Sequence, residues 1–318
     1  MRALITGVTG QDGSYLAEQL TGVGHIVYGL VRGQPTAKWA QVQGLAPGLR
    51  LLQGDLLDQP SLQAALHVAQ PDVVFNLGAL TSIGMSWGQP IVMSEVTGMG
   101  CLRLLEAVRA AAPAARVVQA SSADMFGLVT SCPQDESTPL KPRTPYGVAK
   151  AFAHETVASY REAYGMHAST AILFNHVSPR SAEELIVRKV TAAAARIAAG
   201  RQDKLTLGRV DARRDWGWAP DFTRALPLIA EHDTPGDYVL ATGESHSVME
   251  LVEAAFAAAG ITTGPHLESD PALLRPGDTD ERRGDYSKAS ALLGWEPSVL
   301  FGEIVTRLVA SDMAMAAA

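Results

Sequence analysis

Two short stretches of the sequence combine residue types that can do acid–base chemistry. Residues 117–127, VVQASSADMFG, pass from apolar valines directly into Ser122 and Asp124. The stretch PYGVAK places Tyr146 and Lys150 four residues apart, on one face of a helix. A lysine ammonium beside a phenol lowers the pKa of the phenol, and the phenolate can then take a proton from a substrate hydroxyl. Such a pair is common by chance, so its structural context decides its meaning.

Alternating strands and helices supply that context in the first half of the chain. Almost continuously apolar runs indicate strands that are covered on both faces, and helical patterns separate them. This alternation predicts an α/β fold with a Rossmann-like, doubly wound parallel sheet, which binds ligands at the carboxyl ends of its strands. The predicted strands are residues 2–6, 25–31, 49–53, 71–77, 115–121 and 167–174, and the predicted helices include 13–20, 60–69, 97–111 and 145–165.

A glycine-rich loop follows the first predicted strand and opens the first helix. Its glycines have the spacing G-x-x-G-x-x-G, which lets the backbone turn tightly and approach a pyrophosphate. The helix N-terminus adds free N–H groups and a positive dipole end. A simple glycine-rich turn is the alternative interpretation. The candidate cofactor residues in this loop are Gly7, Thr9, Gly10, Gln11, Asp12 and Gly13.

The end of the second predicted strand favours NADP over NAD. An NAD site usually carries a carboxylate there, whereas this sequence has Arg32 in YGLVRG and no acid. A guanidinium suits the 2′-phosphate of NADP, although a solvated surface arginine is the alternative. Asp55 is placed to accept from the adenine amino group, and the small residues Gly78 and Ala79 would let the cofactor pass closely. Leu56 and Leu77 complete the predicted cofactor contacts.

The pattern of predicted helices and strands changes in the second half of the chain. After about residue 174, helices at 183–199 and 247–259 mix with short strands and turns rich in proline and glycine. We predict a smaller, discontinuous C-terminal substrate lobe that covers the ligand edge of the sheet. The predicted bounds are 1–174 for the NADP-binding domain, with part of 209–236 returning to it, and 175–208 with 237–318 for the lobe.

Composition excludes several classes of protein. The 318 residues are 47% hydrophobic and 19% charged, which is ordinary globular composition, and the formal charge of -7 argues against a surface that coats nucleic acid. Two cysteines give neither a disulfide framework nor a metal site, and we expect no metal. We find no signal peptide and no apolar run of membrane-spanning length, and we therefore expect a cytoplasmic protein without a membrane partner.

The nucleotide-binding pattern together with Y-x-x-x-K resembles the short-chain dehydrogenase/reductase family. Longer strings resemble one extended, sugar-nucleotide branch of it, the GDP-mannose 4,6-dehydratase family. These strings run from residue 3 to about 297, nearly the whole chain. They include ITGVTGQDGSYLAE, PYGVAK, YREAYG, VRKV, RRDWG and ATGE.

The resemblance implies a GDP-sugar substrate, NADP that stays bound through turnover, and a reaction of three parts in deoxysugar biosynthesis. Hydride leaves C4 of the hexose with the tyrosine as base, a carboxylate removes the C5 proton as water leaves C6, and the hydride returns to C6. Tyr146 and Lys150 match the family's tyrosine and lysine. Ser122 matches a residue that bonds the C4 oxygen, and Asp124 the carboxylate base. Thr81 matches a substrate-contacting serine.

Further matches imply contacts to the rest of the substrate and to the cofactor. Asn175 and His176 follow the sixth strand, where the substrate and the nicotinamide would lie. Basic residues would neutralise the diphosphate or bind ribose, with a structural ion pair as the alternative for each. Asp215 fits a structural role better than a catalytic one. The remaining predicted substrate residues are Lys189, Arg214, Arg275 and Asp278.

The sequence departs from the family pattern at several positions. Asp124 stands where the dehydratases carry glutamate, which leaves a GDP-sugar reductase or epimerase as an alternative. Val177 and Asp278 replace an acid and a glutamate, so another GDP-hexose or a heptose is a possible substrate. A non-catalytic NADP-binding protein of the same fold is a third hypothesis, which the intact Tyr146 and Lys150 disfavour.

Two arginine-rich loops are also reduced. Arg32 is followed by Gly33, and Arg180 by Ser181, where the family has paired arginines that meet across a tetramer interface. We therefore predict a homo-oligomer that is a dimer rather than a tetramer. Its long helices, which include 90–112 and 145–165, would form the interface.

Overall fold

A seven-stranded, all-parallel sheet forms the larger part of the chain, with strand order β11-β6-β5-β4-β1-β2-β3. The structure is a computed structural model that describes residues 1–129, 131–273 and 280–317. The order reverses between β1 and β4, which is where such sheets bind ligands. The strands are β1 Arg2–Thr6, β2 Ile26–Val31, β3 Arg50–Gln53, β4 Val73–Asn76, β5 Arg116–Ser122, β6 Ala168–Leu173 and β11 Asp237–Leu240.

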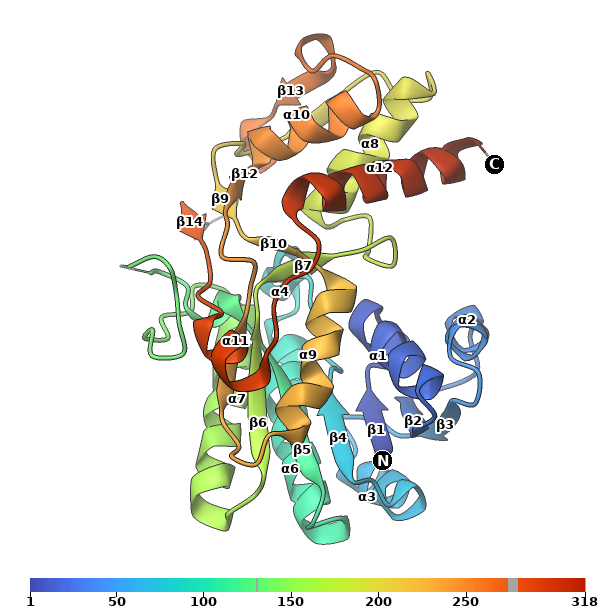
Figure 1. The fold of residues 1–318 in the computed structure, drawn as a ribbon, viewed down its shortest axis with the longest axis vertical. Helices are drawn as coiled ribbons and strands as arrows, with labels where there is room; N and C mark the ends of the chain where they lie inside the picture. Colours follow the sequence, from blue (N-terminus) through green and yellow to red (C-terminus); the bar gives the residue numbers. More distant parts are fainter. Residues whose placement is uncertain (130, 274–279, 318) are drawn as a thin grey trace.

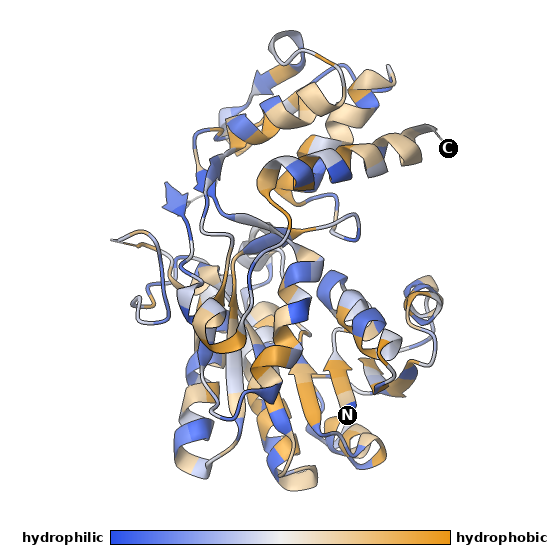
Figure 2. Cartoon of the chain, viewed as in Figure 1, coloured by the Kyte–Doolittle hydropathy of each residue, from blue (hydrophilic) through white to orange (hydrophobic). Residues whose placement is uncertain are grey.

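Helices cover both faces of this sheet (Figure 1). α1, α9 and α11 pack on one face, and α3, α6 and α7 pack on the other. Figure 2 shows the central strands as the most apolar part of the fold. The helices of this domain are α1 Gln11–Gly22, α2 Ala37–Leu45, α3 Gln59–Ala69, α4 Ile83–Gly88, α5 Pro90–Met93, the π-helical η1 Ser94–Met99, α6 Gly100–Ala111, the 3₁₀ turn η2 Ala123–Met125, α7 Pro145–Tyr164, α9 Ala219–Glu231 and α11 Ser287–Leu293.

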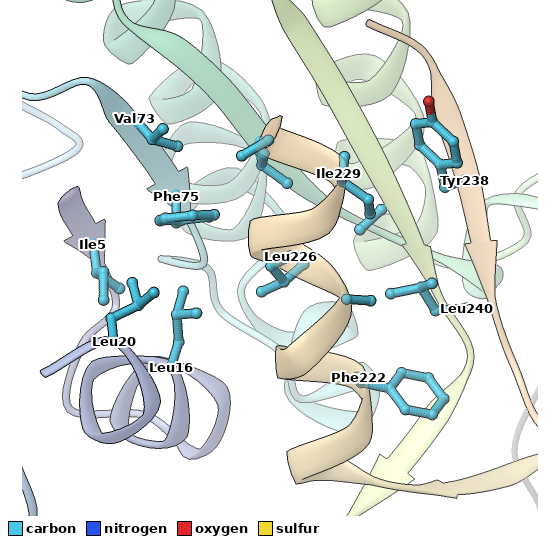
Figure 3. Close-up of a cluster of buried hydrophobic side chains, with 14 of the residues drawn as sticks. Ile5, Leu16, Leu20, Val73, Phe75, Phe222, Leu226, Ile229, Tyr238 and Leu240 are labelled. Carbon is cyan, nitrogen blue, oxygen red and sulfur yellow. The ribbon is translucent and has the colours of Figure 1, made fainter. Parts of the chain in front are cut away.

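The core between the sheet and α1 and α9 is built from large apolar side chains. Figure 3 shows Leu16 and Leu20 of α1 pointing toward Ile5 of β1, with Leu226 and Ile229 of α9 beside them. All five are at most 3% exposed. Burying side chains of this size stabilises a fold by about 1.5–3 kcal/mol each before the entropy cost is subtracted. The strand ends that carry polar groups are therefore held on a rigid base.

A smaller lobe stands beyond the carboxyl ends of the strands (Figure 1). Its own apolar core joins α8, α10 and α12 with β8 and β10. Its elements are β7 Asn175–Val177, α8 Ile186–Ala198, β8 Leu205–Leu207, β9 Arg213–Arg214, β10 Trp216–Trp218, β12 His246–Ser247, α10 Val248–Ala258, η3 Gly264–His266, β13 Leu267–Ser269, η4 Pro271–Leu273, β14 Glu281–Arg282 and α12 Phe301–Ala317.

The six predicted strands and the doubly wound parallel sheet are confirmed, and the domain boundary at residue 237 is wrong. Residues 237–240 form β11, which pairs with β6 at the edge of the main sheet. α11 packs on β11 and α9, so it too belongs with the sheet. The turn residues of DTPGDYV concealed this strand, because its apolar part is only three residues long. The bounds of the lobe otherwise stay a prediction.

The described residues contain neither a membrane-spanning helix nor a cluster of metal-ligating side chains. None of their helices is long and apolar enough to cross a membrane. No group of three or more histidine, cysteine, aspartate or glutamate side chains among them could hold a metal ion.

Candidate active site

The side chains predicted to do chemistry meet at the carboxyl end of β5. Ser122 ends that strand, Asp124 lies in the turn η2, and Tyr146 and Lys150 come from the start of α7. All four residues are buried, with exposed fractions of 8%, 8%, 7% and 3% in that order. α7 packs against β5 and η2, so sequence segments more than 20 residues apart converge.

The start of α7 is set by its own sequence. Thr144 is the N-cap, and its hydroxyl accepts a hydrogen bond from the Gly147 N–H at 3.0 Å. Pro145 follows at the first helical position, where its missing N–H costs nothing. Gly147 also lies against the carbonyl of Asp124, where a Cβ would approach to 2.7 Å. The cap therefore fixes the distance between the helix and the turn that carries Asp124.

A buried network of polar side chains positions Lys150. The Lys150 ammonium donates to the Ala120 carbonyl at 2.7 Å, and the Gln119 amide donates to the same oxygen at 2.7 Å. Asn76 donates to Gln119 Oε1 at 2.6 Å, and Thr6 donates to Asn76 Oδ1 at 2.6 Å. The network thus links β1, β4 and β5 beneath the site. Buried polar groups that are satisfied in this way rigidify their surroundings.

The pKa of Tyr146 is not lowered by Lys150, contrary to the prediction from the spacing of the two residues. The pKa of Tyr146 is raised, first because the phenol is buried and next because the Asp124 carboxylate is near. A hydrogen bond with Ser122 acts in the opposite direction. The Lys150 ammonium lies 5.9 Å from the centre of the phenol ring and donates to a backbone carbonyl instead. In this structure the lysine therefore does not lower the pKa of the phenol.

Burial of Lys150 predicts a pH-dependent stability. Burial lowers the pKa of Lys150 from 10.5 to about 8, so the unfolded chain binds more protons between these values and stability rises with pH there. Below about pH 8 both states are protonated, and the folded state carries the full cost of the buried charge. Relative to Lys150→Met, the wild type should gain roughly 3 kcal/mol of unfolding free energy across this window. Urea unfolding of both nucleotide-free proteins at each end of the window measures the gain, and parallel pH curves would contradict it.

The glycine loop between β1 and α1 packs too closely against backbone to admit side chains at two of its glycines. Gly7 has φ +68°, and a Cβ there would meet the backbone of Leu77 and Gly78 at 2.8 Å. A Cβ on Gly13 would lie 2.3 Å from the Gly7 carbonyl oxygen. Gly10 donates its N–H to the same oxygen at 2.9 Å. Only glycine suits these positions, and the bare N-terminus of α1 is thereby presented to a ligand.

Asp12 and His176 tie the glycine loop to the strand β7. His176 Nε2 lies 2.9 Å from Asp12 Oδ2, and its Nδ1 lies 2.8 Å from the Phe174 carbonyl oxygen. Burial disfavours the charged form of both residues. Their mutual attraction and hydrogen bond have the larger effect, so the pKa of Asp12 is lowered and the pKa of His176 is raised. Gln11 adds contacts with Ser178 and Ser181, at the turn after β7. Asp12 and Gln11 therefore hold the glycine loop against β7 and the turn that follows it.

A pocket lies at the carboxyl ends of β2 and β3. Arg32 is exposed on its rim. Asp55 also lines it, and its carboxylate accepts a hydrogen bond from the Leu57 N–H at 3.0 Å. Leu56 is buried, and Leu77, Gly78 and Ala79 are partly buried after β4. The pocket has a volume of about 220 Å³ and is lined by Arg32, Gly33, Gln53, Gly54, Asp55, Asp58 and Ser61.

The predicted substrate residues lie on several different elements, and two of them fall outside the described residues. Thr81 and Asn175 are exposed after β4 and in β7. Lys189 of α8 donates to the Thr206 carbonyl at 2.9 Å, and Arg214 is buried in β9. Thr9 is partly buried in the glycine loop. Arg275 and Asp278 lie outside the described residues.

Asp215 organises the backbone beside the site. Its carboxylate accepts hydrogen bonds from the N–H groups of Thr242, Gly243 and Gly284 at 2.8, 3.0 and 3.3 Å. The Thr242 hydroxyl adds a fourth at 2.7 Å. Burial raises the pKa of Asp215 despite these donors. Four donors on one carboxylate support the structural role expected from the sequence.

One residue in the site was not found from the sequence. Arg282 of β14 forms an ion pair with Asp124, although 158 positions separate them. Arg282 stands in the charged run DERRGD, which reads as an exposed turn. Its register partner in β9 is Arg214, so both buried arginines lie on neighbouring strands. No pattern in a single sequence reveals a contact of this kind.

Comparison with known proteins agrees with this architecture. A solved UDP-glucose 4-epimerase of Thermus thermophilus, in complex with NAD, is 28% identical, with a TM-score of 0.84 and coverage of 98% of this chain and 99% of that one. DesIV of Streptomyces venezuelae, a dTDP-glucose 4,6-dehydratase with NAD and TYD bound, is 25% identical, with a TM-score of 0.85 and coverage of 98% and 96%.

Sequence relatives are more similar still. GDP-mannose 4,6 dehydratase 1 of Arabidopsis thaliana is 42% identical over 326 residues, which cover 99% of this chain and 90% of the relative. The family model described as GDP-mannose 4,6 dehydratase matches residues 4–308. A match of this extent, in a chain with the Y-x-x-x-K pair at the end of a parallel sheet, identifies the family: the chain belongs to the GDP-mannose 4,6-dehydratases, a branch of the extended short-chain dehydrogenase/reductases.

Proposed function

We propose that the chain converts GDP-mannose to GDP-4-keto-6-deoxymannose and that it uses bound NADP, retained through turnover. The observation that carries the proposal is the buried cluster of Ser122, Asp124, Tyr146 and Lys150 in a chain of this family. Two relatives, 42% and 38% identical over 90% and 91% of their own length, are named as GDP-mannose 4,6 dehydratases. The hydro-lyase activity follows from the same family membership.

The chain's own residues fit a nicotinamide dinucleotide. The glycine cradle at Gly7 and Gly13 excludes side chains and presents the N-terminus of α1, which suits a pyrophosphate. Two solved structures of similar fold are described with NAD bound. When bound, the cofactor supplies the hydride acceptor and donor that the reaction needs. NADP rather than NAD is our proposal from Arg32 on the rim of the pocket.

Each residue of the cluster then has one task. The Tyr146 phenolate takes the proton of the C4 hydroxyl, and the Ser122 hydroxyl holds the C4 oxygen. The Lys150 ammonium fixes the geometry by its bond to the Ala120 carbonyl. The Asp124 carboxylate removes the C5 proton, which the C4 ketone has made acidic. Thr81, Asn175, Lys189 and Arg214 are proposed to contact the GDP-sugar.

Product analysis tests this function. Purified protein with GDP-mannose and a catalytic amount of NADP should form the 4-keto-6-deoxy product without net consumption of reduced cofactor. A GDP-sugar reductase or epimerase is the second candidate, which the shorter base Asp124 and the epimerase fold of a structural relative favour. If no such product forms while NADPH is oxidised by a supplied keto-sugar, the dehydratase proposal fails.

Arg32 should decide between the two nicotinamide cofactors. A charge-assisted hydrogen bond contributes about 1.5–3 kcal/mol, so Arg32→Ala should weaken NADP binding roughly tenfold to a hundredfold. Affinity for NAD, which lacks the 2′-phosphate, should stay unchanged. Titration calorimetry with both cofactors measures this, and Arg109→Ala, far from the pocket in α6, is the control. Equal losses for NADP and NAD would contradict the assignment.

We also propose a homodimer rather than a tetramer. Large apolar side chains of α4, α5 and α7 are exposed on neighbouring helices, and Ile91 is 77% exposed. Arg180, in a loop implied by the resemblance to join tetramers, pairs within its own chain with Glu18 at 2.5 Å. The exposed residues are Met85, Trp87, Ile91, Val92, Val148 and Phe152.

A charge in this apolar surface should separate the subunits. Ile91→Glu should give a monomer by light scattering at micromolar concentration, because a carboxylate cannot be buried in an apolar interface without a partner. Leu300→Glu, at an exposed leucine before α12, serves as the control and should leave the dimer intact. A tetramer of the wild type that resists salt would refute the dimer.

A further inference from the structure

Asp124 is held by a residue from the far end of the chain. The Arg282 guanidinium Nη1 donates to Asp124 Oδ1, and both residues are 8% exposed. The Asp124 N–H donates to Ser122 Oγ at 3.2 Å, which fixes the backbone of the same residue. Among the described residues, no donor reaches the second oxygen, Oδ2. One carboxylate oxygen is therefore fixed, and the other is available to a substrate.

The strand that carries Arg282 is itself fixed on both sides. β14 runs parallel to β9, and the Asp215 N–H donates to the Arg282 carbonyl at 2.9 Å. On the other side, Gln134 is fully buried and exchanges two hydrogen bonds with the backbone of Arg283, at 2.8 and 3.1 Å. Backbone contacts thus set where the Arg282 side chain begins. A planar guanidinium on a fixed backbone is well suited to orient a carboxylate.

The partner of Arg282 separates this pair from the buried ion pairs elsewhere in the described residues. The Nε of Arg282 is buried and finds no acceptor among the described residues. The buried Nε atoms of Arg161 and Arg188 also find no acceptor there, and those arginines pair with Asp237 of β11 and Asp312 of α12. Buried ion pairs also add little net stability compared with apolar residues. Arg282 instead pairs with Asp124, next to Ser122, so its role follows from that partner.

We propose that Arg282 is a positioning residue that orients Asp124 for the elimination step. This inference rests on the proposed role of Asp124 as the C5 base. Aspartate is one methylene shorter than glutamate, and a misplacement of roughly 1 Å can cost on the order of a hundredfold in rate. By holding Oδ1, Arg282 turns Oδ2 toward C5 and limits the positions that the short side chain can adopt.

The step that depends on this orientation balances as follows. The C5–H bond breaks, its proton goes to Asp124 Oδ2, and its electron pair becomes the C5=C6 double bond. The C6–O bond breaks, and the departing hydroxyl takes from Asp124 the proton that came from C5 and leaves as water. Asp124 is thereby returned to its carboxylate form, and the substrate has lost one water molecule. Oxidation at C4 precedes this step and involves Tyr146, which Arg282 does not contact.

The test measures the two steps separately in the full-length protein with its cofactor. Arg282→Met should slow elimination roughly tenfold to a hundredfold, seen as product formation and as deuterium incorporated at C5 from D₂O. Single-turnover oxidation at C4, seen as absorbance of the reduced nicotinamide, should change by less than about threefold, because a misplacement at Asp124 leaves the C4 groups in position. Arg282→Lys keeps the charge and should recover part of the elimination rate. Arg283→Met, at the neighbouring half-buried arginine, is the matched control and should behave as wild type.

Three results overturn the positioning role. They are an equal loss of both steps in Arg282→Met, an elimination rate that does not fall, and an additional loss when Arg282→Met is combined with Asp124→Asn. If Arg282→Met does not fold, Arg282→Gln takes its place, because it keeps a donor for Oδ1. It is judged by the same comparison, the rate of elimination relative to the rate of oxidation at C4.

Asp124→Asn distinguishes this inference from the proposed function on which it rests. If Asp124→Asn still eliminates water, the base assignment itself fails. If Asp124→Asn is inactive in elimination while Arg282→Met is not slowed, the base stands and only the positioning by Arg282 fails.

Discussion

Asp124→Asn should stop elimination while oxidation at C4 continues. The amide has the shape of the carboxylate but cannot take the C5 proton, and loss of a general base typically costs 10²–10⁴-fold in rate, an order-of-magnitude expectation. Oxidation at C4 depends on Tyr146 and Ser122, which the substitution leaves in place. Reduced nicotinamide should therefore accumulate in a single turnover, where the wild type shows only a small transient.

The control for Asp124→Asn is a second aspartate, Asp135, in the same segment between β5 and α7. Asp135 accepts hydrogen bonds from Ser137 and Thr138 on the surface, and Asp135→Asn should leave both steps unchanged. Stopped-flow absorbance and product analysis on each variant measure the two rates. A parallel loss of oxidation and elimination in Asp124→Asn would argue against a dedicated base at this position.

The strand ends explain why much of the site could be predicted. A buried strand is apolar along its length, so Ser122 and Asp124 stand out where β5 ends. The helix period places Tyr146 and Lys150 on one face, and parallel topology brings that face to the same edge. Local sequence pattern and global topology therefore agree at these residues.

Other parts of the site depend on contacts that leave no local pattern. The network from Thr6 through Asn76 to Gln119 joins three strands, and its members look like isolated polar residues in the sequence. Arg282 reaches Asp124 only because Gln134 and Asp215 fix the strand that carries it. The helix α2 was also missed, because its only buried residue is Val42 and it shows no apolar period.

The raised pKa of Tyr146 means that the site must favour the phenolate before Tyr146 can act as a base. Burial and the Asp124 carboxylate both favour the neutral phenol. Positive charge near the ring is needed to favour the phenolate, and Lys150 supplies it only if its ammonium is in place. Asp124 therefore affects both steps of the reaction: it is the proposed base of one and makes the base of the other harder to ionise.

Tyr146→Phe should abolish the first step rather than the second. Without the phenol oxygen, nothing takes the C4 hydroxyl proton, so single-turnover oxidation should fall roughly 10²–10⁴-fold and no elimination can follow. Folding should be little affected, because the ring stays and the phenol is neutral when buried. Tyr160→Phe, on the same helix, removes a hydroxyl that donates to Glu106 at 2.6 Å and is the matched control.

The contrast with Asp124→Asn makes the Tyr146 prediction decisive. Tyr146→Phe should show no reduced nicotinamide at all, whereas Asp124→Asn should accumulate it. Affinity for GDP-mannose, measured by calorimetry, should fall by no more than about tenfold, because loss of one neutral hydrogen bond costs about 0.5–1.5 kcal/mol. If Tyr146→Phe still oxidised C4, the proton would have to leave through another group. Ser122, which hydrogen-bonds Tyr146, would then be the first to replace.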